Sequence, residues 1–320
     1  MKVLIVRFSS IGDIVLTTPI VRCLKQQIKD VEVHYLTKDS FKSVLDKNPY
    51  IDFLHTIKND LSEIIPTLKK ENFDCVVDLH HNFRTLKLKK KLGVKSFSYN
   101  KLNWEKFLLT VFKINKLPKT HIVNRYFKTI ESLGVSNDNK GLDYFIDSHD
   151  EVNIKEVLPT EFTSGFNALV VGGSYFTKQI PQNKLNEICL QSKLPLVLLG
   201  GKDDFEIAER VFNNHKNKTI NLCGKLKLNQ SASIIKQSSK VITSDTGLMH
   251  IAAAYKKDII SVWGNTIPEF GMGPYLAGEE SQIIEVKNLS CRPCSKLGYK
   301  KCPKGHFKCM NDIDFTSVRF

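Results

Sequence analysis

Apolar, β-rich runs alternate along the chain with amphipathic stretches of helical period, and this alternation constrains the fold more than any other feature. In the first half we expect strands at 3–8, 32–37, 53–57 and 75–79, and helices near 14–28, 61–71 and 83–92. Such alternation predicts βαβ units with parallel strands. The strands are continuously apolar rather than half polar, which indicates sheets covered on both faces.

The same pattern repeats after the middle of the chain. Here we expect strands at 168–172, 194–200, 219–222, 241–244 and 259–263, and helices near 182–191, 204–213, 229–238 and 247–255. Two such series predict an α/β protein with two Rossmann-like domains, 1–155 and 156–320, divided within the polar stretch 147–163. A length of 320 residues suits two domains of ordinary size.

Composition excludes several classes of protein. With 42% hydrophobic and 25% charged residues the chain is globular rather than disordered, collagen-like or coiled-coil. No apolar run reaches the roughly 18 residues of a membrane-spanning helix. The opening MKVLIVRFSSIGD has no secretory cleavage pattern, so we expect a cytoplasmic chain. Its eight cysteines are then thiols or metal ligands rather than disulfides.

The positive charge is concentrated in one segment. The formal net charge is +14, and residues 84–128 alone hold 13 basic residues against the single acid Glu105. Five aromatic residues are interleaved with them: Phe97, Tyr99, Trp104, Phe107 and Phe112. This mixture is typical of a surface that binds a membrane, an acidic glycolipid or a nucleic acid. The alternative is a solvated basic face of ordinary helices.

A polar turn, Ser9-Ser10-Ile11-Gly12-Asp13, follows the first predicted strand, where open α/β sheets bind their ligands. It lacks the G-x-G-x-x-G spacing, which weighs against a nicotinamide-dependent dehydrogenase. Gly12 permits a tight turn close to a ligand. Asp13 stands at the start of the next helix, as an N-cap or as a general base projecting into the cleft, and the two roles are compatible.

Two strand-end turns of the second half carry groups that bind nucleotides. In Gly172–Lys178, Ser174 and the glycine amides can donate to an anion, and Lys178 supplies a charge suited to phosphate. The alternative is an ordinary glycine-rich turn with an exposed lysine. In Gly200–Asp204, the Asp204 carboxylate either accepts hydrogen bonds from ribose hydroxyls or caps the following helix.

The third turn, Ser244–Ala254, is the most specific. Its small-residue helix begins at Gly247, so the amides of Thr246 and Gly247 form an anion site at the helix N-terminus. Asp245 is itself negative, so it is better suited to sugar hydroxyls than to phosphate. His250 lies one turn into the helix on the side of the site, or is a structural histidine.

Taken together, these residues resemble glycosyltransferase family 9, the ADP-heptose:lipopolysaccharide heptosyltransferases of Gram-negative bacteria. The resemblance rests on RFSSIGDIVLTTP, SDTGLMHIAAA, WGNTIPEFGMGPY and the tail CRPCSKLGYKKCPKGHFKCM, which is similar to the heptosyltransferase II-like branch. It spans essentially the whole chain and implies the GT-B architecture, in which two Rossmann-like domains face a cleft. The family usually has Trp-Pro two residues after the lysine, whereas this chain has Gln179-Ile180-Pro181.

The resemblance implies an inverting enzyme that moves heptose, or a related sugar, from ADP-heptose to a lipopolysaccharide core acceptor, without a catalytic metal or cofactor. Asp13 is then the base that deprotonates the acceptor hydroxyl. The expected acceptor-binding residues are Ser10, Gly12 and Arg84. The expected donor-binding residues are Ser174, Lys178, Asp204, Asp245, Thr246, Gly247 and His250.

The tail places four cysteines within 19 residues, together with His306: Cys291, Cys294, Cys302 and Cys309. The spacing differs from the usual two-pair zinc pattern, and the resemblance implies no metal. A structural zinc site is therefore an alternative that we do not favour over reduced thiols or oxidised pairs.

Two other functions compete with the heptosyltransferase: a nucleotide-sugar epimerase of the same fold, and a nucleic-acid-binding module. The strand-end turns suit pyrophosphate and sugar better than an extended nucleic-acid backbone. We therefore expect residues 84–128 to contact an anionic glycolipid and the inner face of the inner membrane, and we expect no nucleic acid partner.

Overall fold

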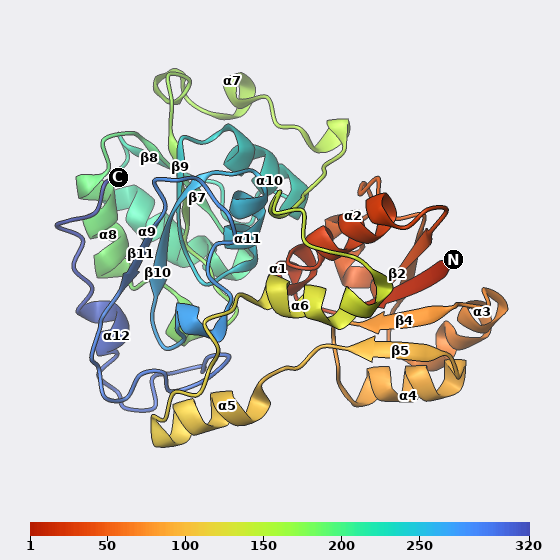
Figure 1. Ribbon diagram of the computed structural model, residues 1–320. Helices are drawn as coiled ribbons and strands as arrows, with labels where there is room; N and C mark the ends of the chain where they lie inside the picture. Colours follow the sequence, from red (N-terminus) through yellow and green to blue (C-terminus); the bar gives the residue numbers. More distant parts are fainter. The chain divides into compact units, whose positions relative to one another are not determined.

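Two parallel β-sheets organise the protein, as Figure 1 shows for the computed structural model, which describes residues 1–320. The N-terminal unit comprises Met1–Leu102 and Thr120–Phe145. The C-terminal unit comprises Asn103–Lys119 and Ile146–Phe320. No helix in either unit is long and apolar enough to cross a bilayer.

The N-terminal unit has a five-stranded sheet in the order β3-β2-β1-β4-β5. Its strands are β1 (Lys2–Val6), β2 (Glu32–Lys38), β3 (Phe53–Ile57), β4 (Cys75–Asp78) and β5 (Lys95–Ser98). Its α-helices are α1 (Ile11–Val15), α2 (Thr18–Gln27), α3 (Ile65–Lys70), α4 (Phe83–Leu92) and α6 (Ile122–Ile130). One face of the sheet packs against α3 and α4 through Leu4, Leu36 and Leu88. Helices α2 and α6 contact each other and also contact the sheet, at β2 and β5 respectively.

The C-terminal unit has a six-stranded sheet in the order β11-β10-β9-β6-β7-β8. Its strands are β6 (Asn167–Val170), β7 (Leu196–Leu199), β8 (Thr219–Asn221), β9 (Lys240–Ser244), β10 (Asp258–Trp263) and β11 (Gln282–Glu285). Its α-helices are α5 (Asn103–Phe107), α7 (Ile154–Val157), α8 (Gln182–Gln191), α9 (Phe205–Asn214), α10 (Leu228–Gln237), α11 (Gly247–Ala254) and α12 (Lys308–Asn311).

The predicted strands all exist, and they pair in parallel. The sequence analysis missed two strands, β5 and β11, one at an edge of each sheet. Both have only four residues and none of these is fully buried, so they lack the continuous apolar run of a central strand.

The two units divide differently from the predicted domains at 1–155 and 156–320. Residues 103–119, expected in the first domain, belong to the C-terminal unit, and the remainder of that unit begins at Ile146. The physical reason is apolar packing, since Leu109 and Leu117 lie against Ile267 and Phe270. The basic segment 84–128 is therefore shared between the two units.

Each sheet has one topological switch point, a pair of neighbouring strands from which the later strands are added in opposite directions. Ligands of open α/β sheets bind at the carboxyl ends of such a pair. In the N-terminal sheet this point lies between β1 and β4. In the C-terminal sheet it lies between β6 and β9. The turns after these four strands are thus the places to look for a site in each unit.

Candidate functional site

Asp13 lies in the first turn of α1, directly after the carboxyl end of β1. The Ser10 hydroxyl donates a hydrogen bond to Asp13 Oδ2 at 2.9 Å, and the Ser10 amide donates to the same atom at 3.2 Å. Ser10 is therefore the N-cap of α1, and Asp13 is the third residue of the helix, which completes a capping box with Ser10 instead of being the N-cap that the sequence suggested. Gly12 lies within the helix without a positive φ, so the expected tight turn does not form there. Gly12 is therefore notable only as the neighbour of Asp13 in the chain, and its role in acceptor binding stays a prediction.

Arg7 is the residue of this site that the sequence analysis missed. Its guanidinium lies 2.7 Å from Asp13 Oδ1 and also donates to the Leu79 carbonyl at 2.5 Å and the Tyr126 hydroxyl at 3.3 Å. The Arg7 side chain is only 8% exposed, so its position is fixed by these partners. An arginine directly after an otherwise apolar strand was the available signal, because a buried charge needs a partner.

The Asp13 carboxyl is held in its ionised form. Burial by itself raises the pKa of Asp13, but the Arg7 charge and the Ser10 hydrogen bonds outweigh it and lower the pKa below its ordinary value. Asp13 is therefore a carboxylate at neutral pH, with one oxygen on Arg7 and the other on Ser10. It can accept a proton from a hydroxyl group placed against it.

Arg84 lies exposed in the first turn of α4, beyond the carboxyl end of β4. Since β4 pairs with β1, Arg84 and Asp13 belong to the same edge of the sheet. On the same helix, Lys89 turns inward, where its ammonium lies 2.9 Å from the fully buried Asp78 carboxylate. Lys89 is thus part of the core rather than of a basic surface.

Two expected donor-binding residues meet in the C-terminal unit. Lys178 follows β6 and Asp245 follows the neighbouring β9, and the Lys178 ammonium lies 2.6 Å from Asp245 Oδ2. The Thr266 hydroxyl, beyond β10, donates to the same carboxylate at 3.1 Å. Three strand-end turns therefore converge on Asp245, at the reversal point of the sheet.

The N-terminus of α11 adjoins this ion pair, because Asp245 directly precedes its cap. Thr246 is the N-cap and Gly247 the first helical residue, and the Thr246 hydroxyl oxygen accepts from the Met249 amide at 3.4 Å. Both residues are partly exposed, so the helix terminus is accessible to an anion. His250 is only 2% exposed and lies within the helix, so a donor-binding role for it stays a prediction.

Asp204 closes the turn after β7 by accepting a hydrogen bond from the Gly201 amide at 2.7 Å. This bond caps the short 3-10 turn Lys202–Asp204, whereas the Asp204 side chain makes no capping hydrogen bond to α9, the helix that the sequence analysis expected it to cap. Burial raises the pKa of Asp204, the Gly201 bond opposes that effect, and the Asp203 charge adds to it. A Cβ atom on Gly172 would collide with the Asp204 carboxylate, so the turns after β6 and β7 pack directly together. Ser174 is exposed in the first of these turns.

The cysteine-rich tail packs against the turn that carries Lys178. The Tyr299 amide donates to Thr177 Oγ1 at 2.8 Å, and the Thr177 amide donates to the Tyr299 carbonyl at 3.2 Å. The Phe176 and Phe307 rings stack with centroids 5.1 Å apart. The tail thus supports the turn that carries Lys178, a role that its cysteine spacing did not indicate.

The tail also supports the turn after β10. Arg292 donates to the carbonyls of Gly264 at 2.5 Å and Thr266 at 2.9 Å, and pairs with Glu285. Among the cysteines, Cys291 Sγ lies 3.9 Å from His306 Nε2. Burial raises the pKa of Cys309 to about 12, with smaller contributions from the other three tail cysteines, so this thiol is protonated at neutral pH.

Two units, each built on an open parallel sheet with polar and charged side chains at the carboxyl ends of its strands, are the architecture of the GT-B fold. The family model for glycosyltransferase family 9 (heptosyltransferase) matches residues 62–304. The chain therefore belongs to glycosyltransferase family 9.

Individual relatives and solved structures to which the chain is similar are heptosyltransferases as well. The chain is 26% identical over 333 residues to lipooligosaccharide heptosyltransferase 2 of Campylobacter jejuni, covering 98% of this chain and 94% of that one. It is similar in fold to heptosyltransferase II of Escherichia coli, with a TM-score of 0.70, 16% identity and 98% of both chains covered. It is also similar to an E. coli heptosyltransferase solved with ADP, with a TM-score of 0.66, 21% identity, and coverage of 88% and 92%. The predicted fold, family and transferase activity are confirmed, and the comparisons favour neither the epimerase nor the nucleic-acid-binding module.

Proposed function

We propose that this protein transfers heptose from ADP-heptose to the lipopolysaccharide core, with inversion at the transferred carbon. The observation that carries the proposal is the Lys178–Asp245 pair at 2.6 Å beside the N-terminus of α11. The Lys178 ammonium and the amides of the helix terminus can bind a diphosphate, and the Asp245 carboxylate can bind sugar hydroxyls. The similar heptosyltransferase solved with ADP supports adenine as the base.

The chain's own residues supply the chemistry. Asp13 accepts the proton of the acceptor hydroxyl as that oxygen attacks, and Arg7 and Ser10 hold the carboxylate in place. Negative charge develops on the leaving diphosphate, where Lys178 and the amides at Gly247 stabilise it. These groups serve the role that a metal ion has in other transferases, so we propose that catalysis needs no bound cofactor.

Asp13→Asn and Lys178→Ala test these roles separately. Asp13→Asn is expected to lower kcat by at least 10²-fold while ADP affinity, measured by calorimetry, stays within twofold of wild type. Lys178→Ala is expected to weaken ADP binding by about tenfold, because it removes a charge-assisted contact. Near wild-type turnover in the first variant, or unchanged ADP affinity in the second, would refute the assignment. Tighter binding of UDP than of ADP would refute the donor.

We further propose a peripheral membrane contact, narrower than the predicted 84–128, through the exposed side of residues 103–114. This side carries apolar groups that are 44–66% exposed: Trp104, Phe107, Val111, Phe112 and Ile114. Leu109 on the opposite side packs against Phe270, which fixes the segment to the C-terminal unit. Aromatic groups exposed beside lysines suit the surface of an anionic membrane that holds the acceptor.

Vesicle co-sedimentation tests this contact. Trp104→Ser with Phe112→Ser is expected to reduce binding to vesicles of phosphatidylethanolamine and phosphatidylglycerol at least fivefold, without changing ADP affinity. Leu190→Ser is the matched control, since Leu190 is 71% exposed on α8. Equal binding by the double variant and the control would refute the contact. Neutralising Lys90 and Lys91 on α4 tests the wider predicted segment 84–128, and Lys89 is left unchanged because it is paired with Asp78.

A further inference from the structure

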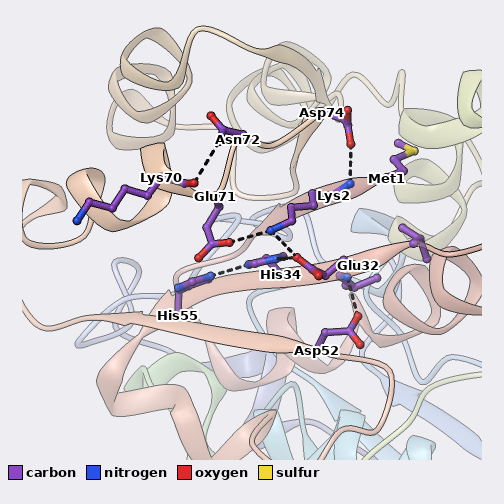
Figure 2. Close-up of polar contacts among 12 residues, drawn as sticks. Met1, Lys2, Glu32, His34, Asp52, His55, Lys70, Glu71, Asn72 and Asp74 are labelled. Atoms are coloured by element: carbon purple, nitrogen blue, oxygen red, sulfur yellow. Dashed lines mark hydrogen bonds and ion pairs between the residues drawn. The ribbon is translucent and has the colours of Figure 1, made fainter.

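A cluster of titratable side chains lies near the amino ends of the strands in the N-terminal sheet. Asp13 follows the opposite, carboxyl end of β1. Figure 2 shows Lys2 on β1, Glu32 and His34 on β2, and Glu71 directly after α3. One ligand atom from each of Glu32, His34 and Glu71 lies within 4.8 Å of the others. Residues distant in sequence thus bring two carboxylates and an imidazole to one point.

The His34 ring is held rigidly in this cluster. It is completely buried, stacks on Phe53 with centroids 4.7 Å apart, and meets the edge of Phe73 at 4.9 Å. These walls fix the direction of His34 Nε2, which lies 2.8 Å from Glu32 Oε1. The ring therefore keeps its orientation when Nε2 gives up the proton that it shares with Glu32 and binds an ion instead.

The second ring nitrogen of His34, Nδ1, has a hydrogen-bond partner, as the second nitrogen of a metal-bound histidine does. His34 Nδ1 lies 2.8 Å from His55 Nε2, and the two ring planes are within 9° of parallel with centroids 5.1 Å apart. A metal-ligating histidine donates its second N–H to an acceptor, which fixes the tautomer and frees the ligating lone pair. A neutral His55 ring can be that acceptor at Nε2.

A cation already occupies the centre of this cluster. The Lys2 ammonium lies 2.9 Å from Glu32 and 3.1 Å from Glu71, so two negative charges share a single positive charge. The Lys2 side chain is 37% exposed and can turn into solvent. A dication in the same place would balance both carboxylates.

We propose that Glu32, His34 and Glu71 bind a divalent first-row transition-metal ion, Mn²⁺ or Zn²⁺, in exchange for the Lys2 ammonium. A donor set of one imidazole and two carboxylates suits both ions. The ion joins β2 to the segment after α3, at the end of the sheet opposite Asp13. Its role is therefore to stabilise the N-terminal unit, independently of the proposed function.

Mn²⁺ is the preferred probe, because it prefers carboxylate ligands over the thiolates of the tail. Paramagnetic resonance of free Mn²⁺, titrated with the full-length protein, is expected to show one bound ion per chain. Glu71→Gln should weaken binding at least tenfold, and Lys2→Met should strengthen it at least tenfold. Glu187→Gln is the matched control, since its carboxylate also pairs with a lysine, Lys184, at 2.8 Å.

A thermal readout separates binding from misfolding. Mn²⁺ should raise the Tm of the wild type and of Glu187→Gln, but not of Glu71→Gln, because a ligand of the folded state raises its stability. If Glu71→Gln fails to fold, Glu32→Gln replaces it. No stoichiometric binding by the wild type, equal binding by Glu71→Gln, or binding by Lys2→Met alone would each overturn the proposal. In the last case Lys2 is the native occupant.

Discussion

Replacing Arg7 by glutamine tests whether this buried arginine sets the charge and position of the Asp13 carboxylate, the proposed base. The substitution removes the 2.7 Å ion pair to Asp13 but keeps a polar side chain near the Leu79 carbonyl. Asp13 keeps both hydrogen bonds from Ser10. The variant therefore loses the ion pair to Asp13, together with the neutral hydrogen bonds of the guanidinium to the Ser9 carbonyl and the Tyr126 hydroxyl.

The expected size of the effect follows from burial. Both side chains are mostly buried, at 8% and 20% exposure, and a hydrogen bond to a charged group contributes about 1.5–3 kcal/mol. Arg7→Gln should thus lower the free energy of unfolding by about 2 kcal/mol. At about 2–4 °C per kcal/mol for a chain of this size, Tm should fall by roughly 4–8 °C. Misplacement of the carboxylate by about 1 Å should lower kcat by about 10²-fold.

The pH dependence gives the sharper test. In the wild type the folded pKa of Asp13 lies below its ordinary value, because Arg7 and Ser10 outweigh burial. The stabilisation from this pair is present above the unfolded pKa and is lost as the pH falls through the folded pKa. Without Arg7 the folded pKa of Asp13 rises, so the acidic limb of kcat/KM should move to higher pH.

Arg22→Gln is the matched control, measured by the same thermal melts and pH–rate profiles. Arg22 is also buried in the N-terminal unit and pairs with Asp138 at 2.8 Å. It also pairs with Asp143, so its loss should lower Tm by at least as much while the acidic limb stays in place. If the limb of Arg7→Gln coincides with that of Arg22→Gln, Arg7 does not control the ionisation of Asp13.

Two further substitutions test the donor edge. Asp245→Asn removes the carboxylate that pairs with the Lys178 ammonium. Calorimetry should then find ADP bound about fivefold more tightly, which corresponds to about 1 kcal/mol, while kcat falls. Weaker ADP binding would contradict the idea that Asp245 and the diphosphate compete for Lys178. Gly172→Ala forces the Asp204 carboxylate to move and should cost about 1–3 kcal/mol of unfolding free energy in denaturant titrations. Gly273→Ala, whose Cβ would meet nothing closer than 3.9 Å, should change stability by less than about 0.5 kcal/mol.

The sequence predicted the two sheets because their central strands are buried on both faces and so are continuously apolar. The edge strand β5, with the sequence KSFS, has no such run and could not be found by this signal. The place of residues 103–119 could not be predicted either. Leu109 and Leu117 are apolar in any context, and only the folded chain brings Ile267 and Phe270 to them.

The sequence predicted those candidate site residues that lie in the turns after strands. Parallel strands place their carboxyl ends at one edge, so Lys178 and Asp245 were expected at the same edge, and they lie in contact. The sequence did not reveal that the tail supports these turns. Its Arg292 and Tyr299 act through backbone carbonyls and amides, which carry no sequence signature.

The Lys178–Asp245 pair gives a physical reason to expect that a complete nucleotide sugar binds better than its diphosphate alone. A diphosphate competes for the Lys178 ammonium with more negative charge than one carboxylate offers. Asp245 is only 12% exposed, so once released it is a buried carboxylate whose one remaining donor is Thr266, at 3.1 Å. Such a group is costly without further hydrogen bonds. Sugar hydroxyls can supply them, so ADP-heptose should bind more tightly than ADP in the wild type and lose that advantage in Asp245→Ala.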